Sequence, residues 1–260
     1  MKRTKNPKFW ILYGSVVSLG LALIGLALYR VIDDQTTGIW IVLALLAGAM
    51  GSFSLKIPGI NGRVSAGDTI TCLSILLLGP YAGALTAAVD ALGGSLRCKS
   101  SAQRFRFALY NSGNSAISAF VVGQVTMGLL GKPILYHQAV LSASSLLLPL
   151  CVLAGGYFLL NTVLVAAAAA VEKSLSFIDT WRDGFMWTCV NYMAGAFVAG
   201  MLVQVPDPLS PAKLGVILFT FAAVYISSRA HVRLAQEVQH LRENAQPDNG
   251  SDQSTGAAVA

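Results

Sequence analysis

The sequence predicts an all-α fold, a polytopic membrane helical bundle with six full spans plus a broken helical hairpin at 69–96, about eight helical segments in all. Its 260 residues are 55% hydrophobic and only 12% charged, with a mean hydropathy of +0.63. Soluble domains carry roughly a quarter of charged residues. Long stretches without Asp, Glu, Lys or Arg also recur along the chain, and about 20 apolar residues suffice to cross a bilayer.

The candidate spans are these uncharged stretches, which are 9–29, 38–55, 69–89, 107–131, 133–171, 184–206 and a shorter 214–228. The first follows a basic N-terminus, but it is longer than a signal-peptide core and lacks a good cleavage site, so we expect it to stay attached. Gly79-Pro80 interrupts the third stretch. Because proline suits the first turn of a helix and not its middle, we expect two short helices there that run in and back.

The basic residues indicate how the spans are arranged. If the chain folds back at Gly79-Pro80 and 133–171 crosses once, 15 of the 18 Lys and Arg residues fall on one side. If 69–96 is instead one uninterrupted span and 133–171 again crosses once, 8 Lys and Arg residues fall on one side and 10 on the other. Cytoplasmic loops carry the excess of basic residues, so the first arrangement is preferred, with both termini cytoplasmic and the protein in the inner membrane of a bacterial cell.

Three regions follow from this pattern: an integral membrane domain over 1–229, a cytoplasmic exit helix over 230–244 and a disordered tail over 245–260. The exit helix contains no proline or glycine, and Leu234, Val238 and Leu241 follow the spacing of a short coiled-coil seam. It is either a solvated helix, a transmitter helix or the contact of a homodimer. The tail is poor in apolar residues, as disordered segments are.

Asp90 is the only acidic residue well inside an apolar run. A carboxylate within a membrane is costly and is by default a candidate for function. Arg97 follows it by two helical turns, and Arg63 and Asp68 belong to the preceding Gly- and Pro-rich loop, where Asp68 could cap the next helix. Asp90 therefore either pairs with one of the two arginines near the cytoplasmic interface or binds a ligand or a proton.

The span after the hairpin begins with an unusually polar segment. Asn111 and Asn114 are three residues apart and share one helix face. They either join helices by hydrogen bonds, the commoner use of such residues in membranes, or bind a ligand together with the hairpin. The predicted ligand-binding set is Asp90, Asn111, Asn114, Asp68, Arg63 and Arg97.

Motifs of known catalytic chemistry are missing from the sequence. There is no H-E-x-x-H, no phosphate-binding loop and no G-x-S-x-G elbow. None of the three histidines stands near carboxylates at metal-ligand spacing. We therefore expect no enzyme activity, no cofactor and no metal site. The basic residues are grouped between apolar runs, as topology signals are, so nucleic-acid binding is not expected.

The run Arg63-Val-Ser-Ala-Gly67-Asp68, followed by Leu78-Gly79-Pro80-Tyr-Ala-Gly83 and by Asp90-Ala-Leu-Gly-Gly, carries two resemblances. It resembles the N-terminal membrane region of bacterial signalling proteins that end in an HD-type phosphohydrolase or a diguanylate cyclase domain. Tyr110-Asn111, Asn161-Thr162 and the segment 225–233 fit the same likeness, which covers most of 40–235. Over 63–96 alone, the chain is also similar to the substrate-binding S-components of energy-coupling-factor vitamin transporters.

The first resemblance implies a sensor-like inner-membrane module that binds a small or lipophilic ligand and signals through its C-terminal helix. The chain has neither an HD dyad nor a GGDEF-like stretch, so it would act with a separately encoded cytoplasmic partner. The second implies a substrate-binding component of a vitamin-like transporter, working with a coupling protein. This chain departs from that family by an additional N-terminal span. A membrane scaffold without a ligand is the third hypothesis. The lipid bilayer is a partner in all three.

Overall fold

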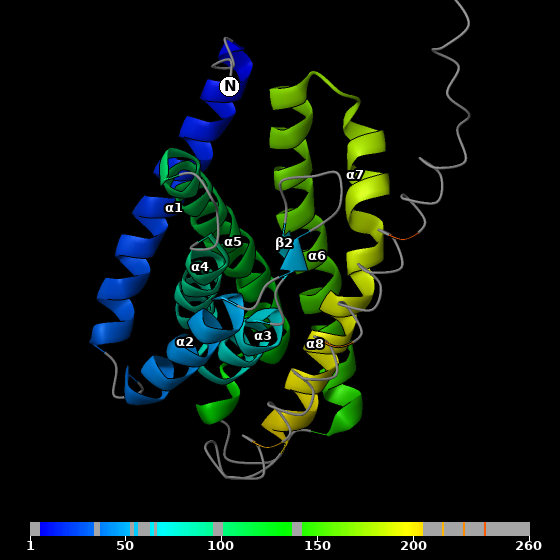
Figure 1. Ribbon diagram of the computed structural model, residues 1–260. Coiled ribbons are helices and arrows are strands. Elements are labelled where there is room, and N and C mark those ends of the chain that lie inside the picture. Colours follow the sequence, from blue (N-terminus) through cyan, green and yellow to red (C-terminus); the bar gives the residue numbers. More distant parts are fainter. Residues whose placement is uncertain are drawn as a thin grey trace, which may run out of the picture.

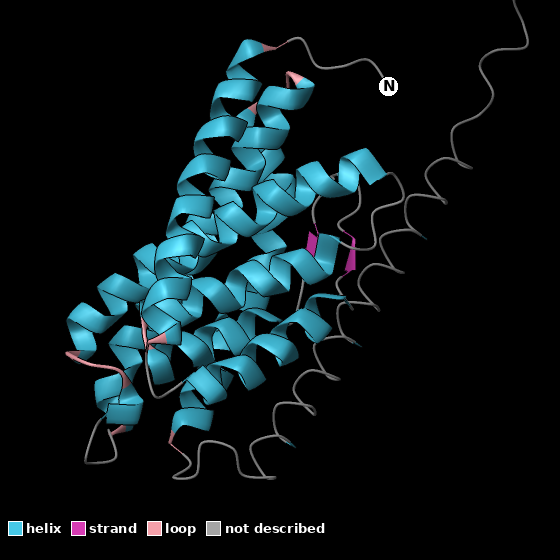
Figure 2. Ribbon diagram, turned by 90° about the vertical axis from the view of Figure 1, so that its left-hand side faces the viewer, coloured by secondary structure: helices cyan, strands magenta, loops and turns pink. Residues whose placement is uncertain are grey.

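The computed structural model describes residues 6–33, 37–52, 55–56, 63–64, 67–95, 101–136 and 142–204, and the single positions 215, 226 and 237. The described chain is helical apart from short connections and one antiparallel two-stranded ribbon (Figure 2), which confirms the all-α prediction. Apart from those single positions, the candidate span 214–228, the exit helix and the tail lie outside the described residues.

The elements follow one another as α1 (Pro7–Ile32), α2 (Thr37–Ser52), β1 (Leu55–Lys56), β2 (Arg63–Val64), α3 (Gly67–Leu78), α4 (Pro80–Ser95), α5 (Ser101–Leu130), η1 (Ile134–Tyr136), α6 (Ala143–Lys173), α7 (Phe177–Phe185), η2 (Met186–Thr188) and α8 (Cys189–Val203). Figure 1 shows α1 along one side of the bundle and α6 to α8 along the other, with α3, α4 and α5 between them.

The prediction of six full spans is wrong for the described chain. Three helices, α1, α5 and α6, are long and apolar enough to cross a membrane, and a fourth span results if α7 and α8, bent by 55°, count as one. The 16-residue α2 is about 24 Å long, which is shorter than the roughly 30 Å of hydrocarbon. The stretch 133–171 contains one long helix, α6, that continues through Pro149, as the single crossing requires.

The outer surface of the bundle is apolar. Large hydrophobic side chains of α1 and α6 point outward, among them Leu19, Leu21, Leu26, Leu147 and Leu148. In water such a surface would be unusual for a monomer. Together with the long apolar helices, it supports association with a membrane.

The chain reverses direction at Gly79-Pro80, as predicted. Gly79 has a φ of +96°, which glycine adopts without steric cost, and Pro80 begins α4. Ser74 and Thr86 then face one another, with their hydroxyl oxygens 3.0 Å apart. A Cβ at Gly83 would overlap the side chain of Ile75, so the two helices meet closely at Gly83.

The ends of the long helices gather at two sides of the bundle. At one side the Tyr13 hydroxyl of α1 donates to the backbone carbonyl of Arg106 at 3.2 Å, and Arg106 lies 4.0 Å from Glu172 at the end of α6. At the other side the guanidinium of Arg30 lies 6.0 Å from the ring centre of Tyr81, next to the hairpin turn. The start of α1, the start of α5 and the end of α6 are thus adjacent, and the distribution of Lys and Arg predicted these three ends on the same side.

Small residues allow the helices of the hairpin region to approach closely. A Cβ at Gly20 of α1 would overlap the Cα of Gly113 in α5, and one at Gly93 of α4 would overlap the carbonyl oxygen of Gly48 in α2. In a membrane, where helices gain little from burying apolar surface against one another, such close van der Waals contacts hold helices together.

Replacing Gly20 by alanine should therefore destabilise the bundle, because the added methyl group must push α1 away from α5. Overpacking of this kind costs about 1–3 kcal/mol, or roughly 2–12 °C in Tm for a chain of this size. Thermal denaturation of the purified protein in detergent measures the effect.

Gly25→Ala is the matched control, because Gly25 lies on the same helix with nothing within 4 Å of its added Cβ. It should be neutral or slightly stabilising, since alanine is the better helix former. Equal effects of the two substitutions would contradict the close crossing of α1 and α5.

Candidate ligand site at the open end of the hairpin

The two aspartates of the hairpin lie together at its open end. Asp68 stands in the first turn of α3 and Asp90 on α4, twenty-two positions later. Because the turn is at Gly79-Pro80, these positions face one another, and the two carboxyl groups interact electrostatically. Both side chains are buried, with 8% and 7% of their surface exposed. Acidic side chains are rarely buried unless a partner compensates their charge.

The Asp90 carboxyl group occupies the point where α2, α3 and α4 meet. A Cβ at Gly67 would overlap this carboxyl group, and a Cβ at Gly51 would overlap the backbone oxygen of Asp90. Both neighbours must therefore be glycine. Gly67 is the first residue of α3, so the carboxyl group lies at a helix N-terminus, where the helix dipole favours negative charge.

The carboxyl pair lies at about half the depth of the bundle. The Ser112 hydroxyl of α5 donates to the carbonyl of Ala88 at 3.2 Å, two residues before Asp90. The next residue of α5, Gly113, lies against Gly20, which is at the centre of α1. Because α1 is long enough to span a membrane, the open end of the hairpin lies level with the middle of a span.

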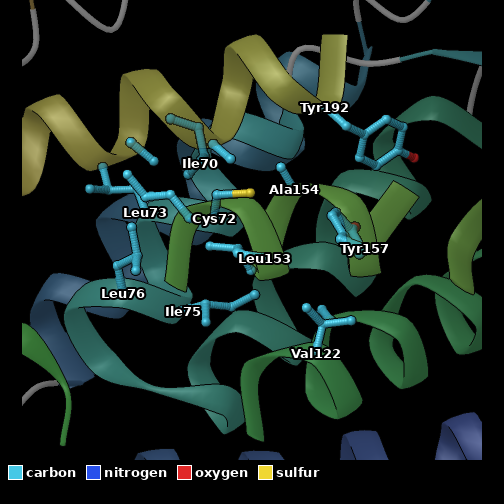
Figure 3. Close-up of a cluster of buried hydrophobic side chains, with 14 of the residues drawn as sticks. Ile70, Cys72, Leu73, Ile75, Leu76, Val122, Leu153, Ala154, Tyr157 and Tyr192 are labelled. Carbon is cyan, nitrogen blue, oxygen red and sulfur yellow. The ribbon is translucent and has the colours of Figure 1, made fainter. Parts of the chain in front are cut away.

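A polar network reaches this region from α5, α6 and α8. The Asn114 amide donates to the Asn161 side-chain oxygen at 2.5 Å, and the Asn161 amide donates to the Tyr192 hydroxyl at 2.6 Å. The rings of Tyr192 and Tyr157 are 5.3 Å apart, edge to face. Figure 3 shows these two tyrosines side by side near Cys72. Both tyrosines lie within electrostatic range of the two aspartates.

Three buried polar atoms around the network have no hydrogen-bond partner within the described part of the chain. They are the Thr71 hydroxyl on α3, and the Asn114 side-chain oxygen and the Ser118 hydroxyl on α5. All three residues have 0% exposed surface. Leaving such an atom unpaired costs about 1–3 kcal/mol, so these three atoms lower the stability of the bundle.

The structure brings some of the predicted site residues together. Asp68, Asp90 and Asn114 are buried and belong to the same polar region. Asp68 stands in the first turn of α3, where a negative charge stabilises the helix. Asn111 is half-buried one turn before Asn114 and forms no hydrogen bond with another described residue. The Arg63 side chain and all of Arg97 lie outside the described residues, so their pairing with Asp90 stays a prediction.

Several residues of the region could not be singled out from the sequence. Tyr157 and Tyr192 stand within long apolar stretches, where a tyrosine does not indicate a polar contact. Thr71 stands in an apolar helix and belongs to no motif. Asn161 joins α6 to α5 and α8 by hydrogen bonds with Asn114 and Tyr192. Isolated polar residues in apolar runs were the available signal, but they do not reveal which helices meet.

The described residues contain no group of three or more His, Cys, Asp and Glu side chains that could hold a metal ion. Comparison with protein-family models, with curated proteins and with solved structures finds no match to this chain. Both family resemblances therefore stay predictions.

Removing the Tyr192 hydroxyl tests the network. Tyr192→Phe leaves an Asn161 amide proton unpaired inside the bundle, so we expect a loss of about 1 kcal/mol, or roughly 2–4 °C in Tm. Tyr157→Phe is the control, because the Tyr157 hydroxyl bonds to no other described residue. Thermal denaturation in detergent compares the two variants, and a larger loss for Tyr157→Phe would show that the network is wrongly assigned.

Proposed function

We propose that the protein is a multi-span membrane module that binds a small ligand between the open end of the α3–α4 hairpin and α5, and signals the occupancy through its C-terminal helix. The observation that supports this best is the pair of unpartnered oxygens on α5, those of Asn114 and Ser118. Buried polar atoms are normally satisfied, and a ligand with hydrogen-bond donors would satisfy both.

The ligand would be held by one face of α5. Asn111, Asn114 and Ser118 follow one another at spacings of three and four residues and so share that face. Asn114 and Ser118 are fully buried and Asn111 is half-buried. A ligand along this face would be a small or elongated molecule with an apolar body.

The hairpin is suited to move when a ligand binds. Its helix α4 packs on α2 through glycines, because Gly93 lies against Gly48 and Gly51 lies against Asp90. Helices that pack through small residues can slide with little change in side-chain contacts. The α3–α8 packing, in which Gly195 lies against Thr69, would pass the movement to the helix that leads toward the C-terminus.

A second function is favoured by the depth of the site. Short helices that end near the middle of the membrane, beside buried charge, are typical of substrate sites in transporters. A substrate-binding component of a small-molecule transporter is therefore the alternative. Both proposals place the protein in a bacterial inner membrane with cytoplasmic termini, working with a separately encoded signalling or coupling protein, and neither includes a catalytic step.

A thermal-shift screen of the purified protein against small metabolites and lipids tests ligand binding. A bound ligand at 100 times its Kd stabilises the protein by about 2.7 kcal/mol, which is roughly 5 °C or more. Asn111→Ala and Asp90→Asn should reduce the shift at a fixed concentration. Gln124→Ala, an exposed amide on the same helix, should leave it unchanged.

If no compound stabilises the wild type, or if Asn111→Ala and Asp90→Asn respond as the wild type does, the proposed site is wrong. Vesicles then distinguish the two functions. Uptake of the ligand into vesicles that also contain an energising partner supports transport, and binding without uptake supports sensing.

A further inference from the structure

We propose that Arg106 binds the phosphate group of an anionic phospholipid at the surface of the membrane. Arg106 stands in the second turn of α5, beside the start of α1 and the end of α6. The site is separate from the ligand region along Asn111, Asn114 and Ser118, and it does not depend on the function proposed above.

Three aromatic rings of α1 surround the Arg106 guanidinium. Its central carbon lies 5.5 Å from the ring centre of Phe9, 4.9 Å from that of Trp10 and 5.9 Å from that of Tyr13. A cation is attracted to the electron-rich face of an aromatic ring. The Tyr13 hydroxyl also donates to the backbone carbonyl of Arg106, so the guanidinium is held in place mainly by rings and backbone.

The hydrogen-bonding capacity of this guanidinium is unused within the described chain. Its Nε is buried and has no hydrogen-bond partner. Its ion pair with Glu172 joins Nη2 to Oε1 at 4.0 Å, which is too long for a hydrogen bond. Of the three nitrogens only Nε is buried without a partner, so the two terminal nitrogens, which also form no hydrogen bond with a described residue, are accessible from outside.

This combination suits a phosphate group. A guanidinium has five N–H donors in a fixed plane, and its terminal pair matches two oxygens of a phosphate. Such charge-assisted, bidentate hydrogen bonds are stronger than neutral ones. Because the aromatic rings already hold the Arg106 side chain, little conformational entropy is lost when the phosphate binds.

Arg106 lies at the height of the lipid headgroups. Gly20 crosses Gly113 near the middle of α1. Trp10 is ten residues before Gly20, or roughly 15 Å along the helix, which is half the thickness of the hydrocarbon core. Arg106 is seven residues before Gly113, or roughly 10 Å, and its side chain leans toward the helix N-terminus, so that its charged end reaches the same height.

The three helix ends around Arg106 carry an excess of positive charge. Over 6–13, 101–110 and 167–173 the chain has four basic residues, Lys8, Arg104, Arg106 and Lys173, and one acidic residue, Glu172. Basic residues beside a span are attracted to anionic lipids. The charge therefore favours a lipid with a net negative headgroup over a zwitterionic one.

The surroundings of the site favour a lipid over a free phosphate ion. Ile11 follows Trp10 on α1, Phe105 precedes Arg106 on α5, and these two apolar side chains are 70% and 66% exposed. A free ion would leave them in water. The acyl chains of a phospholipid bound at Arg106 would cover them, so one molecule meets both the polar and the apolar needs of this surface.

The test follows the Tm of the full chain in mixed micelles of a neutral detergent with a rising mole fraction of phosphatidylglycerol. The Tm should rise and saturate, because a ligand that binds the folded protein stabilises it. Phosphatidylcholine, whose net charge is zero, should give a smaller rise at the same mole fraction. Sodium phosphate without lipid, at constant ionic strength, should give no saturating rise.

Arg106→Gln should raise the mole fraction of phosphatidylglycerol at half the maximal effect roughly tenfold, because the hydrogen bonds from a charged group are lost. Arg106→Lys keeps the charge without the paired donors, so its effect should be intermediate. Arg104→Gln is the matched control. It removes the same charge from the same helix two residues away, where the side chain points elsewhere, and should change the value less than about twofold.

Glu172→Gln tests the site without altering the arginine. Glu172 is the carboxylate beside Nη2, and it competes with a phosphate for the same group. Its removal should therefore lower the mole fraction of phosphatidylglycerol at half the maximal effect. If Arg106→Gln does not fold, this variant decides, and unchanged or weaker binding by Glu172→Gln overturns the proposal.

Three further results would overturn it. Equal responses of the wild type to phosphatidylglycerol and phosphatidylcholine would mean that headgroup charge is not recognised. Equal losses in Arg106→Gln and Arg104→Gln would show a general attraction of charge. A response to sodium phosphate as large as that to phosphatidylglycerol would show an ion site and not a lipid site. A negative screen for the small ligand leaves the proposal standing.

Discussion

The position of the Asp90 carboxyl group is the constraint on which the rest of the structure depends. It lies where α2, α3 and α4 meet, and it fits there only because Gly51 and Gly67 have no side chains. The same carboxyl group lies at the N-terminus of α3, where the helix dipole stabilises negative charge. A short helix that begins inside the bundle thereby has a carboxyl group close to its first turn, where amide groups have no partner within the helix.

This arrangement explains why polar and apolar regions of the bundle are so sharply divided. The hairpin turn and its flanks are embedded in apolar side chains such as Ile75, Leu76 and Leu85. The open end instead collects aspartate, threonine, asparagine and tyrosine, and part of their hydrogen-bonding capacity is unused. Stability alone would favour apolar side chains of similar size there.

Much of the fold could be predicted from the sequence because its signals are local. Proline cannot continue a helix, so Gly79-Pro80 revealed the reversal, and the length of α6 followed from its uncharged run and the distribution of Lys and Arg. The number of full spans was overestimated, since hydropathy alone counts an apolar stretch such as α2 as a span although its helix is only 16 residues long.

The site itself was only partly predictable. Asp90 stood out because a single charge in an apolar run is conspicuous, and its proximity to Asp68 follows once the turn is placed. Tyr192 and Thr71 gave no comparable signal, because their roles depend on which faces of α3, α6 and α8 meet. Those contacts arise from the packing of helices that are far apart in the chain, and a single sequence does not indicate which helix faces pack together.

The most direct measurement is a disulfide across the hairpin. In a variant whose native cysteines are replaced, Ser74→Cys and Thr86→Cys should form a disulfide under mild oxidation, because the two hydroxyl oxygens are 3.0 Å apart. Mass spectrometry would show the loss of two hydrogens and protection from alkylation. If both thiols stay reactive, the chain runs on as one helix, in which these positions are about 18 Å apart, and the meeting of the two aspartates is contradicted.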